Sequence, residues 1–276
     1  MLDGPRVPIK LIALDLDGTL LRSDHSVGPR SLEALHAAHA KGIEIVLASG
    51  RMTPAMERTA AALGLDVCLI SYNGAAVCGR LSEGRERLFH RPLRADIASA
   101  VYAYASEHGL QINYYLDDLI HSENDPKLRP FMELYRERTG SPFHLVDSLK
   151  DFLHRDPTKV LLVLEPSRRE EVAAHWKEKL GERADVVRTE QEYLEFLAPG
   201  ADKGSAVAFL GEKLGIEEAA ILTMGNGEND IPMLQRAGWS VAVANACPAC
   251  KAAAKAVTVN DHENDAVAEA LERWVL

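Results

Sequence analysis

Several features that would point to other classes of protein are missing from this sequence. No apolar run approaches the roughly 18 residues of a membrane-spanning helix, and the longest runs, such as residues 43–48, have the length of a strand. Residues 1–10 lack the apolar segment of a signal peptide, because Asp3, Pro5 and Pro8 interrupt them. We therefore expect a cytoplasmic protein that makes no membrane contact.

Blocks rich in lysine or arginine are also missing, and the formal net charge is −10. An acidic surface repels nucleic acid and anionic membranes, so we expect neither as a partner. The same surface repels phosphorylated compounds at long range. If the protein binds phosphate, the positive charge has to be local: a metal ion, a few basic side chains or the N-termini of helices.

Cysteine is scarce, with four residues in 276. Cys247 and Cys250 form the sequence C-P-A-C, whereas Cys68 and Cys78 stand alone. A single CxxC can be a redox pair or half of a zinc site, but no second pair accompanies it. Because alanines surround it and favour a helix, we interpret these cysteines as packing residues in a reducing compartment.

What the sequence does have is an alternation of strand-like and helical segments at both ends. The predicted strands cover residues 9–16, 43–47, 67–71, 219–224, 241–243 and 256–258. The predicted helices cover residues 29–41, 203–214, 230–237, 247–254 and 265–274, and one more helix follows Arg51 and ends at Leu63. Apolar strands that alternate with helices predict an α/β domain with a doubly wound parallel sheet.

The middle of the chain has a different rhythm, with several strands for each helix. The predicted strands are 88–91, 111–116, 159–164, 186–188 and 193–197, and the predicted helices are 96–107, 127–138 and 168–180. This pattern indicates an α+β insertion built on an antiparallel sheet. We therefore expect a discontinuous core domain, residues 1–82 and 197–276, interrupted by a second domain, residues 83–196.

Two carboxylates follow the first predicted strand. Asp15 and Asp17 belong to the sequence D-L-D-G-T, and residues two apart on a strand point to the same face. Parallel sheets bind ligands beyond the carboxyl ends of their strands. Two carboxylates there suit a hard cation, and they supply both a nucleophile and an acid-base group. The apolar residues on either side favour this interpretation over a solvated turn.

Two further segments carry candidate phosphate ligands. Ser49-Gly50 follows the second strand, where a hydroxyl and backbone N–H groups at a helix start can bind phosphate, although Ser-Gly is also ordinary turn chemistry. Lys203 opens a helix, where the helix dipole disfavours a cation. This placement suggests an anionic partner, and solvation or a pair with Asp202 is the alternative.

The last segment is G-N-G-E-N-D, residues 225–230, after another predicted strand. The Asp230 carboxylate and the amides of Asn226 and Asn229 are oxygen donors suited to magnesium. A polar loop in which Asp230 caps the next helix is the alternative. We expect all four segments to fall at the carboxyl ends of predicted strands of one sheet, so that they can converge.

In order along the chain, D-L-D-G-T-L, S-G-R, D-K-G and G-N-G-E-N-D-I-P-M-L resemble the four motifs of the haloacid dehalogenase (HAD) superfamily. The N-G after Ser71-Tyr72, the large insertion and the A-N-A after Val241 are similar to those of the Cof-type (subclass IIB) phosphatases, including sugar phosphatases. The resemblance covers both ends of the chain and, more loosely, the insertion. It implies a Rossmann-like core with an inserted α+β cap of the C2B type.

The resemblance also implies a role for each matching residue. Asp15 would attack phosphorus, and Asp17 would protonate the leaving group and then activate water. The implied phosphate ligands are Ser49, Gly50, Lys203 and Asn229. The implied Mg²⁺ ligands are Asp15, the Asp17 backbone carbonyl, Asn226 and Asp230. Arg51 and Asn73 are candidate substrate contacts, and the substrate would be a small phosphorylated metabolite such as a sugar phosphate, bound by a monomer or homodimer.

One position departs from the family. Asn226 stands where the motif usually has Asp, and an amide oxygen brings no formal charge to the metal. We expect a weaker metal site that is still functional. A phosphomutase of the same superfamily and a catalytically weakened ligand-sensing protein remain the alternatives to hydrolysis.

Overall fold

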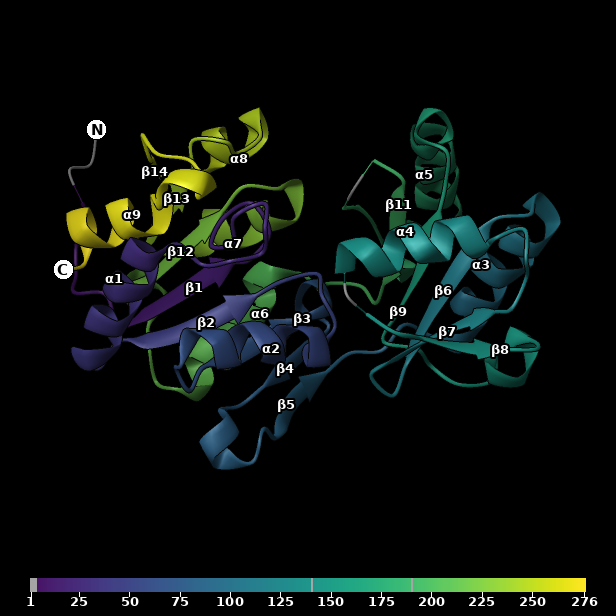
Figure 1. The fold of residues 1–276 in the computed structure, drawn as a ribbon, viewed down its shortest axis with the longest axis horizontal. Coiled ribbons are helices and arrows are strands. Elements are labelled where there is room, and N and C mark those ends of the chain that lie inside the picture. The colour runs from purple at the N-terminus through teal and green to yellow at the C-terminus, as the bar shows by residue number, and fades with distance from the viewer. Residues whose placement is uncertain (1–3, 140, 190) are drawn as a thin grey trace. The chain divides into compact units, whose positions relative to one another are not determined.

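The computed structural model describes residues 4–139, 141–189 and 191–276. The chain divides into two compact units, Met1–Phe89 with Asp202–Leu276 and His90–Ala201 (Figure 1). The second unit is continuous in sequence and interrupts the first. The domain boundaries given above stay predictions, because compactness does not test which segment acts as a cap.

Among the described residues, the first unit contains an eight-stranded sheet in the order β14-β13-β12-β1-β2-β3-β4-β5. Its strands are β1 (Leu11–Asp15), β2 (Glu44–Ala48), β3 (Cys68–Ser71), β4 (Ala76–Cys78), β5 (Arg87–His90), β12 (Ile221–Gly225), β13 (Trp239–Ala242) and β14 (Ala256–Val257). Its helices are α1 (Pro29–Ala40), α2 (Thr53–Leu63), α6 (Lys203–Lys213), α7 (Ile231–Arg236), α8 (Pro248–Ala253) and α9 (Ala266–Trp274). The strands from β14 to β3 pair in parallel, and β4 pairs antiparallel with β3.

The central strand β1 shows why the sheet is covered on both faces. Ile12 and Leu14 belong to an apolar cluster with residues of α1 and α9, while Leu11 and Ala13 belong to a second cluster with residues of α6. Adjacent strand residues point to opposite faces, so an unbroken apolar run needs helices on both. The doubly wound α/β core that the sequence predicts is confirmed.

Two strands of this sheet differ from the sequence prediction. Residues 88–91 are predicted as a strand of the insertion, but β5 is the end strand of the larger sheet. Strand β4 is not predicted at all. It is only three residues long, which is too short for its alternation to stand out from a loop.

The second unit contains a six-stranded sheet among the described residues, in the order β10-β11-β9-β6-β7-β8. Its strands are β6 (Gln111–Leu116), β7 (Leu119–Glu123), β8 (Phe143–Val146), β9 (Lys159–Val163), β10 (Asp185–Arg188) and β11 (Tyr193–Leu197), and its helices are α3 (Ala95–His108), α4 (Arg129–Thr139) and α5 (Pro166–Leu180). The pairs are antiparallel except for β7 with β8, which is parallel. The predicted α+β insertion is confirmed, and two of its six strands, β7 and β8, are not predicted from the sequence.

This unit has an apolar core of its own. Tyr114, Leu162 and Phe196 project from neighbouring strands into one cluster with residues of α3 and α5, including the fully buried Trp176. Strands β7 and β8 contribute little to that cluster and carry polar residues, which is why their sequences do not indicate strands. Within the described residues, no helix is both long and apolar enough to cross a membrane.

Candidate active site

The carboxyl ends of four neighbouring strands bring the candidate residues to one edge of the larger sheet. Strands β12, β1, β2 and β3 are adjacent and parallel. Asp15 is the last residue of β1, and Ser49 follows β2 directly. The turn at residues 72–74 follows β3, and the segment 226–230 follows β12. Parallel pairing therefore gathers motifs that are far apart in sequence.

Lys203 joins two of these segments. Its Nζ lies 2.6 Å from Asp15 Oδ1 and 2.6 Å from Asp230 Oδ1. The side chain of Lys203 is fully buried, as is that of Asp230. An ammonium group between two carboxylates makes a compact charged cluster with more negative than positive charge. Of the alternatives for Lys203, the structure selects the anionic partners over Asp202.

Two close backbone contacts set the start of α6 and thus the position of Lys203. Asp202 caps the helix, since its carboxylate accepts from the Ser205 backbone N–H at 2.9 Å. Gly74 has φ of +103°, and a Cβ there would lie 2.2 Å from the Asp202 carbonyl oxygen. A Cβ on Gly204 would lie 2.6 Å from the Pro232 carbonyl carbon. Only glycine allows α6 to approach this turn and α7 so closely.

The surroundings of the Asp15 carboxyl raise its pKa. Burial, and after it the nearby Asp230 carboxylate, raise its pKa to about 7 in spite of Lys203, which lowers it. For Lys203, burial lowers the pKa, but Asp15 and Asp230 outweigh it and the net shift is upward. Lys203 is therefore charged, and it leaves the two carboxylates incompletely neutralised.

Asp230 is held from both sides. Its Oδ2 accepts from the backbone N–H groups of Asn226, at 2.8 Å, and Gly227, at 2.9 Å, while Oδ1 contacts Lys203. A Cβ on Gly225 would lie 2.5 Å from the Asp230 Cβ. The loop after β12 is thus folded around this carboxylate.

Asp17 lies apart from the Lys203 cluster. Its carboxylate accepts two hydrogen bonds from Arg51, with Nε at 2.8 Å from Oδ2, and its side chain is 47% exposed. Arg51 Nη2 also lies 3.2 Å from His25 Nδ1. Nothing in the sequence around His25 indicates this contact, because His25 lies in a turn at residues 22–26 and is 26 positions away from Arg51 along the chain.

The candidate phosphate ligands lie beside the turn after β3. Ser49 Oγ accepts from the Arg51 backbone N–H at 3.1 Å, and the Ser49 carbonyl accepts from the Asn73 N–H at 3.0 Å. Asn229 Nδ2 donates to Asn73 Oδ1 at 2.9 Å. A Cβ on Gly50 would lie 3.0 Å from the same Asn73 oxygen. The structure therefore brings Ser49, Gly50 and Asn229 together around Asn73, which connects the ends of β2 and β12.

Asn226 contacts the loop after β1. Thr19 Oγ1 lies 3.2 Å from Asn226 Oδ1, and a Cβ on Gly18 would lie 2.5 Å from Asn226 Nδ2. Asn245 Nδ2 donates to the Gly18 carbonyl at 2.8 Å. Asn245, which belongs to the A-N-A motif, therefore supports the loop after β1, which carries Asp17 and which Asn226 contacts.

The donor set suits a hard cation. No group of three or more Asp, Glu, His or Cys side chains gathers around a common point in the part of the chain that the structure describes. Mg²⁺ does not need one, because it is usually bound by one or two carboxylates together with waters and phosphate oxygens. Burial first, and the neighbouring Asp230 second, raise the pKa of Asp15, so ionising both carboxyls here calls for more positive charge than Lys203 alone supplies, and a dication fits there.

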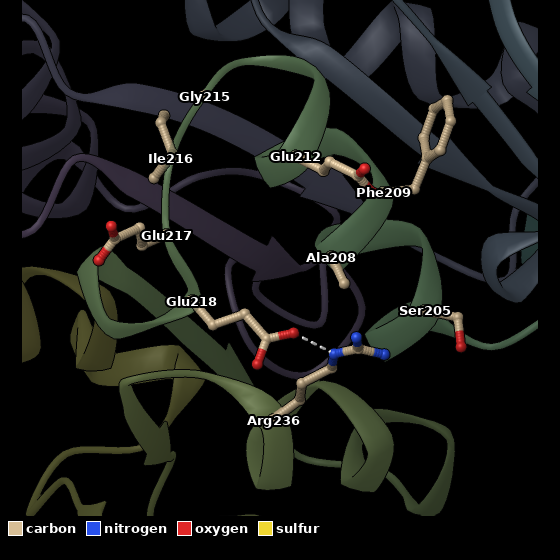
Figure 2. A pocket seen from close by; sticks show the side chains of 9 residues that line it. All are labelled: Ser205, Ala208, Phe209, Glu212, Gly215, Ile216, Glu217, Glu218 and Arg236. Atoms are coloured by element: carbon tan, nitrogen blue, oxygen red, sulfur yellow. Dashed lines mark hydrogen bonds and ion pairs between the residues drawn. The ribbon is translucent and has the colours of Figure 1, made fainter.

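A separate cavity of about 600 Å³ on this unit lies along α6 (Figure 2). It is lined by Ser205, Ala208, Phe209, Glu212, Gly215, Ile216, Glu217, Glu218 and Arg236. Figure 2 shows Glu218 engaging Arg236, which is the one basic side chain among these residues. Since three carboxylates line this cavity and no candidate site residue does, it does not suit a phosphate.

Comparisons with known proteins find relatives along nearly the whole of this chain. The model of the haloacid dehalogenase-like hydrolases matches residues 12–271. The chain is 32% identical to the putative phosphatase YxeH of Bacillus subtilis, over 97% of this chain and 98% of that protein. It is 30% identical to the HMP-PP phosphatase of Cronobacter sakazakii, over 96% of each. A haloacid dehalogenase-like hydrolase of Bacteroides thetaiotaomicron has the same fold, with a TM-score of 0.86 and 30% identity over 96% of this chain and 99% of that one.

Another relative is a longer protein. The chain is 31% identical, over 95% of its length, to the Arabidopsis thaliana protein named chloroplastic endoribonuclease YBEY, and spans 46% of that protein. Its name therefore describes a molecule with a large part that this chain does not match. The Bacillus subtilis and Cronobacter sakazakii relatives match over nearly the whole of both chains and are named as phosphatases.

The protein is an enzyme of the phosphatase class. It belongs to the haloacid dehalogenase-like hydrolases, and the resemblance found in its motifs is confirmed.

Proposed function

We propose that this protein hydrolyses small phosphomonoesters, such as sugar phosphates, with Mg²⁺ and through an aspartyl-phosphate formed on Asp15. The observation that carries the proposal is the buried ammonium of Lys203, 2.6 Å from both Asp15 and Asp230, at the carboxyl edge of the sheet. A phosphoryl group brings negative charge to this edge. Phosphoryl transfer needs fixed positive charge there more than it needs covalent chemistry from the protein.

In this proposal the Asp15 carboxylate attacks phosphorus, and the bond from phosphorus to the substrate oxygen breaks. Asp17 gives a proton to that oxygen and later takes one from the water that hydrolyses the aspartyl-phosphate. To do so, the Asp17 carboxyl exchanges its contact with Arg51 for the substrate oxygen. Arg51 is then free to bind the substrate, which is consistent with its candidate role.

Other side chains hold the transferred group. Ser49, the Gly50 N–H, Lys203 and Asn229 would bind the phosphoryl oxygens, and Asn73 would keep Asn229 in place through their 2.9 Å hydrogen bond. Asp15, the Asp17 carbonyl, Asn226 and Asp230 would hold Mg²⁺. When bound, Mg²⁺ supplies charge neutralisation for the carboxylates and the phosphoryl oxygens.

The test is phosphate release from a panel of sugar phosphates and other phosphomonoesters, with Mg²⁺ or with EDTA. Because one relative is named HMP-PP phosphatase, the panel includes diphosphate esters. We expect release that needs Mg²⁺ and disappears in Asp15→Asn. In native protein, rapid quenching should trap a phosphoryl group that is labile at high pH, as acyl phosphates are.

Two results would contradict the proposal. Release that persists in well-folded Asp15→Asn would remove the proposed nucleophile. Transfer of the phosphoryl group to a second hydroxyl of the substrate, without release, would identify a phosphomutase.

A further inference from the structure

The cysteine pair Cys247 and Cys250 is not used by the proposed reaction. Cys247 precedes α8 and Cys250 lies in it, and their Sγ atoms are 2.8 Å apart. The sulfur atoms of a disulfide are about 2.05 Å apart, so closing this pair needs a movement of less than about 1 Å. The other two cysteines cannot pair in this way, because Cys68 and Cys78 contribute to apolar clusters on opposite faces of the sheet.

The two thiols differ in access. Cys247 is partly exposed, whereas Cys250 is fully buried. A reagent in solution therefore reaches Cys247 first, and Cys250 is placed to react only with the sulfur of Cys247. This division suits an attacking thiol and a resolving thiol.

Both cysteines also contact the loop after β12. The Cys247 backbone N–H donates to the Asn226 carbonyl at 2.9 Å, and the Cys250 thiol donates to the Gly227 carbonyl at 2.8 Å. The N–H groups of the same two loop residues hold the Asp230 carboxylate. Gly227 therefore connects the two groups, because its carbonyl accepts from the Cys250 thiol and its N–H donates to the Asp230 carboxylate.

We propose that Cys247 and Cys250 are a modification site, at which a low-molecular-weight disulfide oxidises the two thiols to an intramolecular disulfide, and that this oxidation weakens cation binding at the loop after β12. The first part depends only on the cysteines. The second part rests on the proposed Mg²⁺ site.

The reaction balances with the disulfide reagent as oxidant. The Cys247 sulfur attacks one sulfur of the reagent, whose S–S bond breaks to release one thiol and leave a mixed disulfide on Cys247. The Cys250 sulfur then attacks Cys247 Sγ, and a second reagent thiol leaves. Two protein thiols are oxidised, one reagent disulfide is reduced to two thiols, and the two protein protons end on those thiols.

The disulfide has a direct structural consequence. Cys250 no longer carries the hydrogen that it donates to the Gly227 carbonyl, and its sulfur turns toward Cys247. Losing one hydrogen bond costs about 1 kcal/mol. If that loss falls on the loop that holds Asp230, Mg²⁺ affinity decreases about fivefold.

The first experiment counts thiols and measures intact mass after incubation with oxidised glutathione, followed by removal of the reagent and denaturation. We expect the native protein to lose two of its four thiols and two hydrogens in mass, with no glutathione attached. Cys250→Ser should stop at the mixed disulfide on Cys247, and Cys247→Ser should not react. Cys78→Ala is the matched control and should still lose two thiols.

Two outcomes would overturn the modification site. One is a native protein that keeps all its thiols under conditions that glutathionylate Cys250→Ser. The other is a native protein that accumulates a stable glutathione adduct, which means that Cys250 does not resolve it.

The second experiment measures Mg²⁺ binding by calorimetry to the reduced and the oxidised native protein. We expect about fivefold weaker binding after oxidation, restored by dithiothreitol. Unoxidised Cys250→Ser is the control, since its hydroxyl can still donate to Gly227, and its affinity should equal that of reduced native protein. Equal affinity in both redox states would overturn the coupling, whereas no binding by reduced protein would contradict the proposed function instead.

Discussion

Lys203 is the residue on which the charge balance of the site depends. It is a cation without access to water, and it contacts two carboxylates that belong to different segments. Removing one member of a buried ionic cluster is far more costly than removing a surface ion pair, because the remaining charges stay buried without compensation.

We predict that Lys203→Met destabilises the metal-free protein by about 3 kcal/mol. Urea denaturation in EDTA measures this, and Mg²⁺ should restore part of the loss because it supplies positive charge to the same carboxylates. Lys213→Met is the matched control, since Lys213 is exposed at the end of the same helix. Equal stability of the two variants would contradict the role that we assign to Lys203.

The pKa of Asp15 predicts how Mg²⁺ binding depends on pH. Burial and the neighbouring Asp230 raise this pKa to about 7, so below pH 7 the folded protein holds a proton that a cation has to displace. Apparent Mg²⁺ affinity should therefore decrease about tenfold for each pH unit below 7 and level off above it. Calorimetric titrations from pH 5.5 to 8.5 measure the profile.

Asp15→Asn is the control for that profile, because it removes the proton that competes with the cation. Its weaker binding should not show the break near pH 7. The same raised pKa affects the stability of the metal-free protein. Protonated Asp15 stabilises the fold fully at pH values below its unfolded-state pKa, and this contribution is lost as the pH rises through 7. A native profile without a break would show that Asp15 is not the competing group.

A substitution at Asn226 should strengthen the proposed Mg²⁺ site. Its Oδ1 lies beside Thr19 in the loop after β1, next to Gly18. Asn226→Asp would add a negative charge to the proposed ligand set, and we predict about tenfold tighter Mg²⁺ binding. Unchanged affinity in a correctly folded variant would count against a ligand role for this position.

At the scale of secondary-structure elements, the contact between α6 and α7 aligns the two segments that carry Lys203 and Asp230. Gly204 makes this contact possible, because a Cβ there would lie 2.6 Å from the Pro232 carbonyl carbon. We predict that Gly204→Ala costs about 1–3 kcal/mol and lowers Mg²⁺ affinity or kcat, because one helix has to shift.

Gly215→Ala separates this effect from a general loss of stability. Gly215 follows α6 with φ of +68°, and no atom lies within 4 Å of a Cβ built there. Its cost should be about 1 kcal/mol of backbone strain, with unchanged kcat and Mg²⁺ affinity. If both variants changed the site equally, close approach of α6 and α7 would not be the reason.

Elements with strong apolar patterns could be predicted from the sequence, and weakly patterned ones could not. Strand β1 and helices α1 and α6 begin and end within two residues of the predicted bounds. Strands β7 and β8 contain polar residues and lie at one end of their sheet. Their strand conformation depends on pairing with β6 and with each other, which a single sequence does not reveal.

At the scale of the whole molecule, the unit His90–Ala201 is continuous in sequence and has its own apolar core. We predict that residues 90–201, expressed alone, fold cooperatively, as dispersed amide signals and a single unfolding transition would show. The same fragment with Trp176→Ala should lose 3–5 kcal/mol or fail to fold, because Trp176 is fully buried in that core. A native fragment that remained unfolded would show that this core depends on the larger unit.

The sequence by itself determined the family, the alternation of strands and helices in the core, and the identity of the acidic, basic and amide residues at strand ends. These follow from motifs and hydrophobic patterns between residues that are close together along the chain, so they can be recognised without the fold. Only the tertiary structure decided that Lys203 lies between Asp15 and Asp230, that Asp17 binds Arg51, and that Asn73 links Asn229 to the end of β2. The physical reason is that such contacts join residues up to 188 positions apart, and parallel pairing of β12, β1, β2 and β3 is what brings them to one edge.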